Sequence, residues 1–144
     1  MRVLLVVVVW LSCLSSANAE NQHIQEAKMM RAAFRCSLWA SFADNSSESA
    51  RLQELGFREG AKYLQAATKD IINLNLNSDI PEVLRARITG VYNKDFEMGR
   101  LYEAVYSEAN ALLLNSTVAV NDSRSAMKAT AYSQFNIEDC SNLR

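Results

Sequence analysis

Apolar residues recur at intervals of three and four along most of the chain, the spacing that places them on one face of an α-helix. This pattern predicts four main helices and a short C-terminal one, at approximately 23–43, 46–72 or 74, 79–89, 96–114 and 122–134. No segment shows the strict alternation of a half-buried strand. We therefore expect an all-α fold, a small helical bundle in a single domain.

Each predicted helix carries its own apolar stripe, and these stripes form the predicted core. The stripe residues are Ile24, Ala27, Met30, Phe34, Leu38; Leu52, Leu55, Phe57, Gly60, Leu64, Ala67, Ile71; Val83, Leu84, Ile88; Phe96, Gly99, Tyr102, Tyr106, Ala109, Leu113; and Ala126, Ala129, with Tyr132 or Ala131. A basic stripe of Lys28, Arg31 and Arg35 lies beside the first of them. We expect this basic stripe to be a solvated face, with contact to an anion or a partner as the alternative.

One motif occurs twice within this pattern. The sequence Phe-x-x-Gly-x-x-Tyr is formed by Phe57, Gly60 and Tyr63, and again by Phe96, Gly99 and Tyr102. On a helix each copy puts an aromatic ring, a notch and a second aromatic ring on one face. Because a mid-helix glycine costs about 1 kcal/mol relative to alanine, we predict a packing reason, namely two helices that cross closely at these glycines.

The first residues have the three parts of a secretory signal peptide. Arg2 is followed by an apolar run from Val3 to Leu11, and Ala17-Asn18-Ala19 forms a small-residue cleavage site. We predict cleavage after Ala19, which leaves 20–144 as the mature domain in the periplasm or outside the cell. The alternative is a lipoprotein acceptor at Cys13, although Trp10 stands where such sites carry a small aliphatic residue.

Two cysteines remain once the signal peptide is removed, Cys36 and Cys140. In an oxidising compartment a lone pair of this kind is predicted to form a disulfide. That bond would tie the C-terminal tail to the first helix. The alternative is a pair of buried free thiols.

Charge and composition argue against several functions. The formal net charge of the chain is −1, and the two signs are interspersed. A surface of this kind is not suited to binding nucleic acid or anionic lipid. No segment after the signal peptide is apolar enough to span a bilayer, so we expect a soluble mature protein. No phosphate loop, dinucleotide fingerprint or calcium loop occurs, and we expect no cofactor.

The inventory of catalytic residues is poor. His23 is the single histidine of the chain, and it lies near the mature N-terminus. With the cysteines committed to a bridge, neither a zinc site nor a nucleophile paired with a histidine is expected. A carboxylate pair is the remaining route to hydrolysis, through Glu59 with Glu97 or Glu103. The spacing of Glu59 to Lys62 and of Glu103 to Arg100 favours ordinary surface ion pairs instead.

The aromatic residues and methionines suggest two kinds of binding. Tyrosine side chains at the rim of the bundle would suit contact with a protein partner. The tyrosines are Tyr63, Tyr92, Tyr102, Tyr106 and Tyr132. The alternative is a small apolar ligand in a cavity near Met29, Met30 and Met98. A solid core with an exposed tyrosine-bearing patch would favour the partner, and a closed apolar pocket would favour the ligand.

Three acceptor sequons for N-glycosylation start at Asn45, Asn115 and Asn121. All three fall in predicted loops, and they matter only if the source is eukaryotic. The compact signal peptide favours a bacterial or phage-encoded source. Together these features predict a small exported, non-catalytic protein that binds a protein partner, as an inhibitor, an immunity-type protein or an accessory factor.

Overall fold

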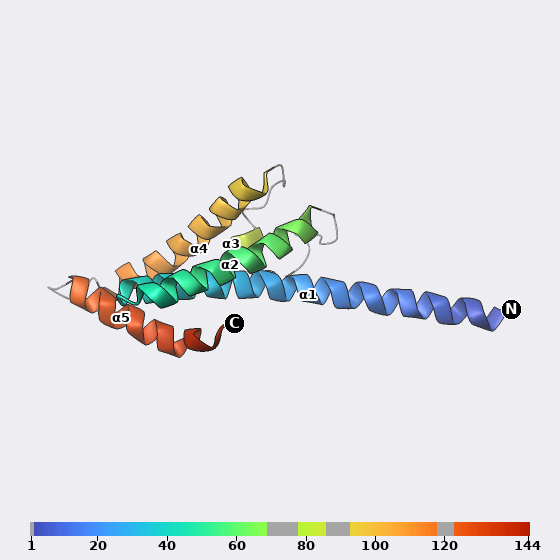
Figure 1. Cartoon of the computed structure of the whole chain (residues 1–144), viewed down its shortest axis with the longest axis horizontal. Coiled ribbons are helices and arrows are strands. Elements are labelled where there is room, and N and C mark those ends of the chain that lie inside the picture. The colour runs from blue at the N-terminus through green and yellow to red at the C-terminus, as the bar shows by residue number, and fades with distance from the viewer. Residues whose placement is uncertain (1, 69–77, 86–92, 118–122) are drawn as a thin grey trace.

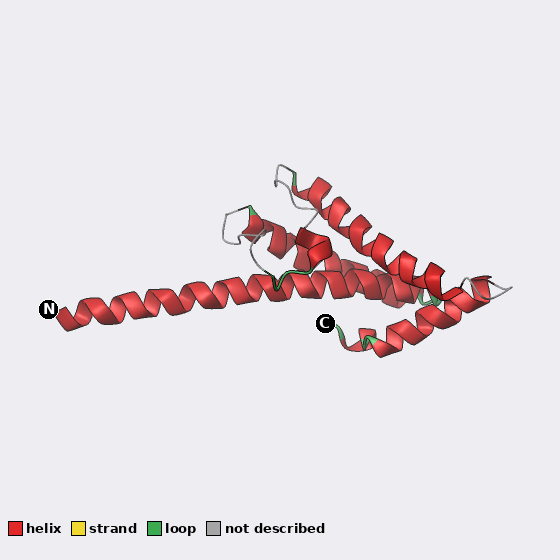
Figure 2. Cartoon of the chain, turned by 180° about the vertical axis from the view of Figure 1, so that it is seen from behind, coloured by secondary structure: helices red, strands yellow, loops and turns green. Residues whose placement is uncertain are grey.

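The computed structural model describes residues 2–68, 78–85, 93–117 and 123–144, with side chains described from residue 22 onward except at 116, 117 and 123. Every regular element in these ranges is a helix, which confirms the predicted all-α class (Figure 2). The elements are α1 (Arg2–Phe42), α2 (Ser46–Ala67), α3 (Glu82–Arg85), α4 (Lys94–Thr117), α5 (Ser123–Ile137) and a final 3₁₀ turn, η1 (Cys140–Asn142).

The helices pack around a hairpin of α1 and α2 (Figure 1). α2 runs back along the C-terminal half of α1, while α4 lies beside α2 and the short α3 packs against α4. α5 packs at the end of the hairpin near its turn and returns the chain toward the middle of the molecule. The N-terminal part of α1 projects beyond the other helices in both views (Figures 1 and 2).

The helix boundaries differ from the predicted ones in several places. α1 begins at Arg2 rather than near His23, because the chain has neither glycine nor proline before Gly56 to break it. α4 begins at Lys94, where the Asn93 side-chain oxygen accepts hydrogen bonds from the backbone N–H groups of Asp95 at 2.9 Å and Phe96 at 3.2 Å. The helix thus begins two residues before the predicted start at 96, with Asn93 as its N-cap.

The C-terminal boundaries differ in both directions. α4 continues to Thr117 and α5 to Ile137, each three residues beyond the predicted end. α2 ends at Ala67 with Thr68 as its C-cap residue, earlier than the predicted 72 or 74. α3 is described as far as Arg85, and its predicted end at 89 lies outside the described residues. At the start of α2, which begins at the predicted Ser46, the Asn45 side chain caps the helix by accepting from the N–H of Glu48.

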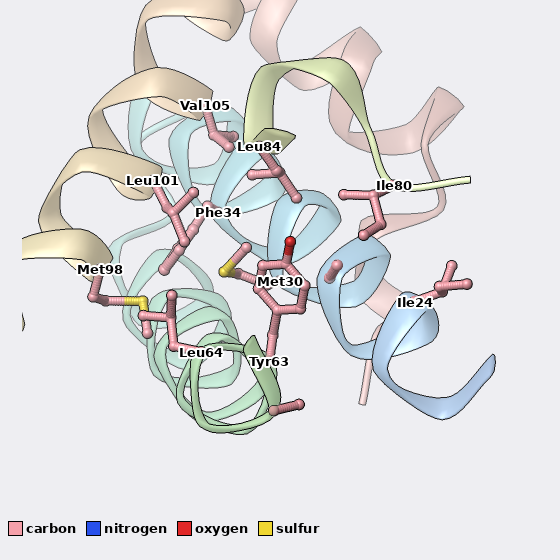
Figure 3. Close-up of a cluster of buried hydrophobic side chains, with 12 residues drawn as sticks. Ile24, Met30, Phe34, Tyr63, Leu64, Ile80, Leu84, Met98, Leu101 and Val105 are labelled. Atoms are coloured by element: carbon pink, nitrogen blue, oxygen red, sulfur yellow. The ribbon is translucent and has the colours of Figure 1, made fainter. Parts of the chain in front are cut away.

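The buried side chains form two clusters. One joins α1, α2 and α4 under α3 (Figure 3), and its largest members are Ile24, Met30, Phe34, Tyr63, Leu64, Ile80, Leu84, Met98, Leu101 and Val105. The other lies toward the turn between α1 and α2, and it includes Trp39, Leu52, Leu55, Leu113 and Ala131. The predicted stripe of the first helix is confirmed, since all five of its residues are buried.

The predicted stripe of α4 is wrong over its first half. Phe96 and Tyr106 are exposed, and the residues that face the core are Met98, Leu101 and Val105. Both sets have helical spacing, and the two faces adjoin each other on the helix. The aliphatic set occupies the core because its side chains reach the crossing with α2. Phe57 of α2, also predicted to be buried, is 42% exposed.

The disulfide between Cys36 and Cys140 is confirmed. It joins residues 104 positions apart with a Cα–Cα distance of 5.6 Å, within the usual range for such bonds. Both cysteines are buried in the cluster that contains Trp39. The bond attaches η1 to α1, as the sequence predicted for the tail.

The predicted basic stripe is only partly a solvated face. Arg31 donates hydrogen bonds to Glu108 of α4 from both Nε and Nη2, and Arg35 donates from Nε to Glu138 at 2.7 Å. Lys28 is exposed. Two of the three cations therefore hold α4 and the C-terminal segment against α1. Among the described residues, no helix is long and apolar enough to cross a membrane.

Candidate interaction surface

Aromatic side chains gather on the outer side of α2 and α4. We define the aromatic surface as Phe57 of α2 with Phe96, Gly99, Tyr102 and Tyr106 of α4. Phe57 is 42% exposed, Phe96 63% and Tyr106 40%, and Tyr102 is half-buried. Isolated exposed apolar residues are common on proteins, whereas a contiguous group of them marks a candidate binding site.

The buried Phe34 of α1 contacts two of these rings, Phe57 and Tyr102. Its ring meets Phe57 and Tyr102 edge-on, with centroids 5.1 Å away in both cases. Phe57 and Tyr102 stack on each other at 6.1 Å, and Tyr106 follows Tyr102 at 6.3 Å. Edge-on and offset-stacked contacts at these distances are favourable for aromatic pairs. Phe57 and Tyr102 are thus held in place by the core, and Tyr106 packs on Tyr102, before anything binds.

Two polar side chains contact residues of the aromatic surface. The Gln53 side-chain amide lies 3.4 Å from the Tyr102 hydroxyl and donates to it, linking α2 to α4. The Arg100 guanidinium lies 5.9 Å from the centre of the Phe96 ring, within cation–π range. One side of the Phe96 ring is therefore already occupied by Arg100.

The two motif glycines have opposite environments. A Cβ at Gly60 would lie 2.6 Å from the sulfur of Met30 and 2.7 Å from the sulfur and methyl of Met98, so the crossing of α2 with α1 and α4 fills this notch. At Gly99 a Cβ would meet no atom within 4 Å. Our prediction of a close crossing is therefore right for Gly60 and wrong for Gly99. The physical reason is that α4 presents Met98, the neighbouring residue, to α2.

The third motif residues also differ. Tyr63 is fully buried, and burial raises the pKa of its hydroxyl. Tyr102 lies at the border of the aromatic surface. Of the other tyrosines, Tyr132 is exposed on α5, and Tyr92 lies outside the described residues.

The candidate carboxylates are buried more deeply than predicted. Glu59 is 8% exposed and Glu97 4%, while Glu103 is exposed. Glu59 accepts hydrogen bonds from Lys62 at 2.9 Å, the predicted pair, and from Arg58 at 3.0 Å. The predicted pair of Glu103 with Arg100 does not form, because Arg100 approaches Glu97 instead, at 3.5 Å.

The electrostatics of Glu59 favour its charged form. Burial raises the pKa of this carboxyl, but the hydrogen bonds and charges of Lys62 and Arg58 outweigh burial and hold the pKa below its usual value. A general acid needs the opposite shift. His23 lies near the start of the bundle, where its Nδ1 is 2.6 Å from Glu26 Oε2.

One group of described side chains has the donor types of a metal site: Cys36, Glu138 and Cys140. The two sulfurs are joined in the disulfide, and Glu138 is paired with Arg35. Metal ligation requires thiolates, so this group in its oxidised form is a structural bridge beside an ion pair.

Two hollows near the α1–α2 turn differ in their lining. One of about 400 Å³ is mainly polar, with Ser41 and Ser49 among its lining residues. The other, of about 340 Å³, is lined by apolar Phe42 and Met127 as well as by charged residues such as Lys128. The methionines expected beside an apolar ligand are packed instead, since Met30 and Met98 close on Gly60 and Met29 packs against the cluster around the disulfide.

The sequons have different settings. Asn45 is exposed at the start of α2. Asn115 is also exposed, but it lies in the last turns of α4 rather than in the predicted loop. Asn121 lies outside the described residues.

Comparisons with protein-family models, with curated proteins and with solved structures find no match to this chain.

Proposed function

We propose that this chain is a small exported, non-catalytic protein that binds a protein partner through the aromatic surface, in the periplasm or outside the cell. An inhibitor, an immunity-type protein or an accessory factor would all act in this way. The observation that carries the proposal is the exposure of three aromatic rings, Phe57, Phe96 and Tyr106. The core residue Phe34 holds Phe57 and also Tyr102, on which Tyr106 packs.

Aromatic side chains of this kind supply much of the energy of protein interfaces. Tyrosine and phenylalanine bury large areas and lose little conformational entropy on binding, so they are enriched in interface cores. Here the rings lose still less, because Phe34 already fixes Phe57 and Tyr102. A preordered surface avoids part of the cost of association.

The charge pattern supports a non-catalytic role. The buried carboxylates of Glu26, Glu59 and Glu97 each lie within 3.5 Å of a histidine, lysine or arginine nitrogen. Hydrolysis by a carboxylate pair needs two acids facing one cleft with separated pKa values. Ion pairing of Glu59 works against that arrangement, so the remote alternative of a carboxylate-dependent hydrolase has little support.

The disulfide and the form of α1 are consistent with export. A bond between Cys36 and Cys140 is expected to persist in an oxidising compartment. The N-terminal part of α1 projects away from the bundle, so cleavage after Ala19 would leave the packed helices in place (Figure 1).

The alternative of a small apolar ligand is favoured by the methionines of the core, Met30 and Met98. Their sulfurs lie against Gly60, however, and fill the space between three helices (Figure 3). A carrier would have to open this contact to make room for its ligand.

Native mass spectrometry of the protein exported by its own host tests the proposal. We expect a complex with a second polypeptide, and a non-reduced denatured control should show a chain that starts at Glu20 and keeps the disulfide. A reproducible small adduct on an otherwise bare chain would favour the carrier instead.

Two exposed tyrosines provide a matched pair of variants. Tyr106→Ser should release the partner, because loss of an interface hot spot costs about 2 kcal/mol or more, roughly a thirtyfold loss of affinity. Tyr132→Ser on α5, where the side chain is 64% exposed, should leave the complex intact. Equal retention of the partner by both variants would contradict the assignment of the surface.

A further inference from the structure

We propose that the partner binds this surface with a basic α-helix that crosses α4 at Gly99. This inference rests on the proposed function and adds the shape and charge of the segment that docks. It starts from a glycine whose position nothing else in the described structure explains.

Gly99 lies within α4, on an exposed face of the helix. Glycine at such a position costs about 1 kcal/mol relative to alanine. At Gly56 and Gly60 close packing offsets this cost, because a Cβ would lie 2.4 Å from the Phe34 ring and 2.6 Å from the Met30 sulfur. At Gly99 no atom lies within 4 Å of that position. In the free chain, therefore, no packing offsets the helix-propensity cost of Gly99. A partner that packs against the backbone at Gly99 would offset this cost.

The residues around Gly99 suit a helix as the approaching element. Phe96, Tyr102 and Tyr106 lie three positions before, three after and seven after Gly99, and they border the same face. The result is a notch between aromatic rings. Ridges of side chains on one helix pack into such grooves on another, and a glycine at the crossing allows the axes to approach closely.

The charges at this surface indicate the sign of the charge that the partner should carry. Most described carboxylates form ion pairs inside the chain, with partners on the same or another helix. Glu54, Asp95 and Glu103 are exposed and have no ion pair among the described residues. Asp95 and Glu103 lie one turn before and one turn after Gly99, and Glu54 lies one turn before Phe57.

The cations near these acids are already engaged. Arg58 and Lys62 pair with Glu59, and Arg100 lies over Phe96 and beside Glu97. Lys94 is exposed, but helical spacing turns it about 140° away from Gly99. Between Lys94 and Tyr106, α4 carries three carboxylates, Asp95, Glu97 and Glu103, against the two cations Lys94 and Arg100. Among the described residues, the aromatic rings of α4 therefore lie beside a net negative charge. Lysine and arginine complement both features, by ion pairing and by packing on the ring faces.

Site-specific photo-crosslinking in the exporting host tests the inference. p-Benzoylphenylalanine placed at Phe96 or Tyr106 keeps an aromatic ring at the surface, and the same residue at Tyr132 of α5 is the matched control. After irradiation, mass spectrometry identifies the segment of the partner that each position reaches. We expect both surface positions to reach one segment that is helical and carries net positive charge.

Two substitutions then test the crossing and the charge. Gly99→Leu should lower the crosslinking yield at both positions by about tenfold or more, equivalent to at least 1.4 kcal/mol of affinity, because the side chain fills the notch. Glu103→Lys should also lower the crosslinking yield, because it replaces a negative charge that would attract the basic helix with a positive one. The unfolding midpoints of both variants, measured alongside, should show that the fold is retained.

The failures of the two proposals are distinguishable. Crosslinks to an acidic or extended segment, or a yield that Gly99→Leu leaves unchanged, would overturn the basic helix while the aromatic surface remained an interface. Surface crosslinks no stronger than those at Tyr132 would overturn both proposals.

Discussion

The two copies of Phe-x-x-Gly-x-x-Tyr share a spacing and differ in almost everything else. In α2, Gly60 lies at the crossing of three helices and Tyr63 is fully buried. In α4, Gly99 is open, Phe96 is 63% exposed and Tyr102 is half-buried. The first copy stabilises the fold, and we assign the second to binding. The difference teaches that a motif on a helix specifies a face but not what that face meets.

The largest effect on stability that we expect comes from the disulfide, which lies away from both copies of the motif. Replacing Cys36 and Cys140 by serine should cost about 2 to 5 kcal/mol, because the bond closes a long loop in the unfolded chain. Since the bond belongs to the cluster around Trp39, its loss should lower stability without changing the contrast between Gly60 and Gly99. Denaturant unfolding with and without reductant measures the effect. A change below about 1 kcal/mol would show that the bond contributes little.

Neighbouring residues of α4 offer the next test. Met98→Ala should destabilise by about 2 to 5 kcal/mol, since Met98 is 9% exposed and fills the Gly60 notch. Phe96→Ala, two positions away on the exposed face, should change the unfolding free energy by no more than about 0.5 kcal/mol. Similar losses for the two variants would mean that the exposed face of α4 is part of the core.

The smallest expected effect concerns Glu59 in the first copy. Because ion pairing holds its pKa below the usual value, Glu59 stabilises the fold above the unfolded-state pKa of about 4.3, and this contribution disappears as the pH falls through the lower folded-state pKa. Glu59→Gln should therefore cost a few tenths of a kcal/mol at pH 7, and this cost should shrink as the pH falls below the unfolded-state pKa. A cost independent of pH would contradict the charge-based account.

The sequence was sufficient to predict the helices and the disulfide, because the helices depend on local spacing and the disulfide on a lone pair of cysteines. It was not sufficient to choose between the two faces of α4. Met98, Leu101 and Val105 have the same periodicity as Phe96, Gly99, Tyr102 and Tyr106, and the choice is made by packing against Gly60.

The polar contacts between residues far apart in the sequence could not be predicted either. Arg31 pairs with Glu108, 77 positions away, and Gln53 donates to Tyr102, 49 positions away. Local charge spacing instead suggested Arg100 with Glu103, where the structure has Arg100 with Glu97. The support of the aromatic surface by Phe34 also depends on how three helices meet, which no local pattern encodes.

The most direct measurement is the change in unfolding free energy for a matched pair of variants, Gly60→Ala and Gly99→Ala. We expect opposite signs. Gly60→Ala should destabilise by about 1 to 3 kcal/mol, because its Cβ would crowd Met30 and Met98. Gly99→Ala should stabilise by up to about 1 kcal/mol, because a methyl group in open space gains helix propensity alone. Destabilisation by both variants would contradict the account, since it would place Gly99 in a packed crossing like that of Gly60.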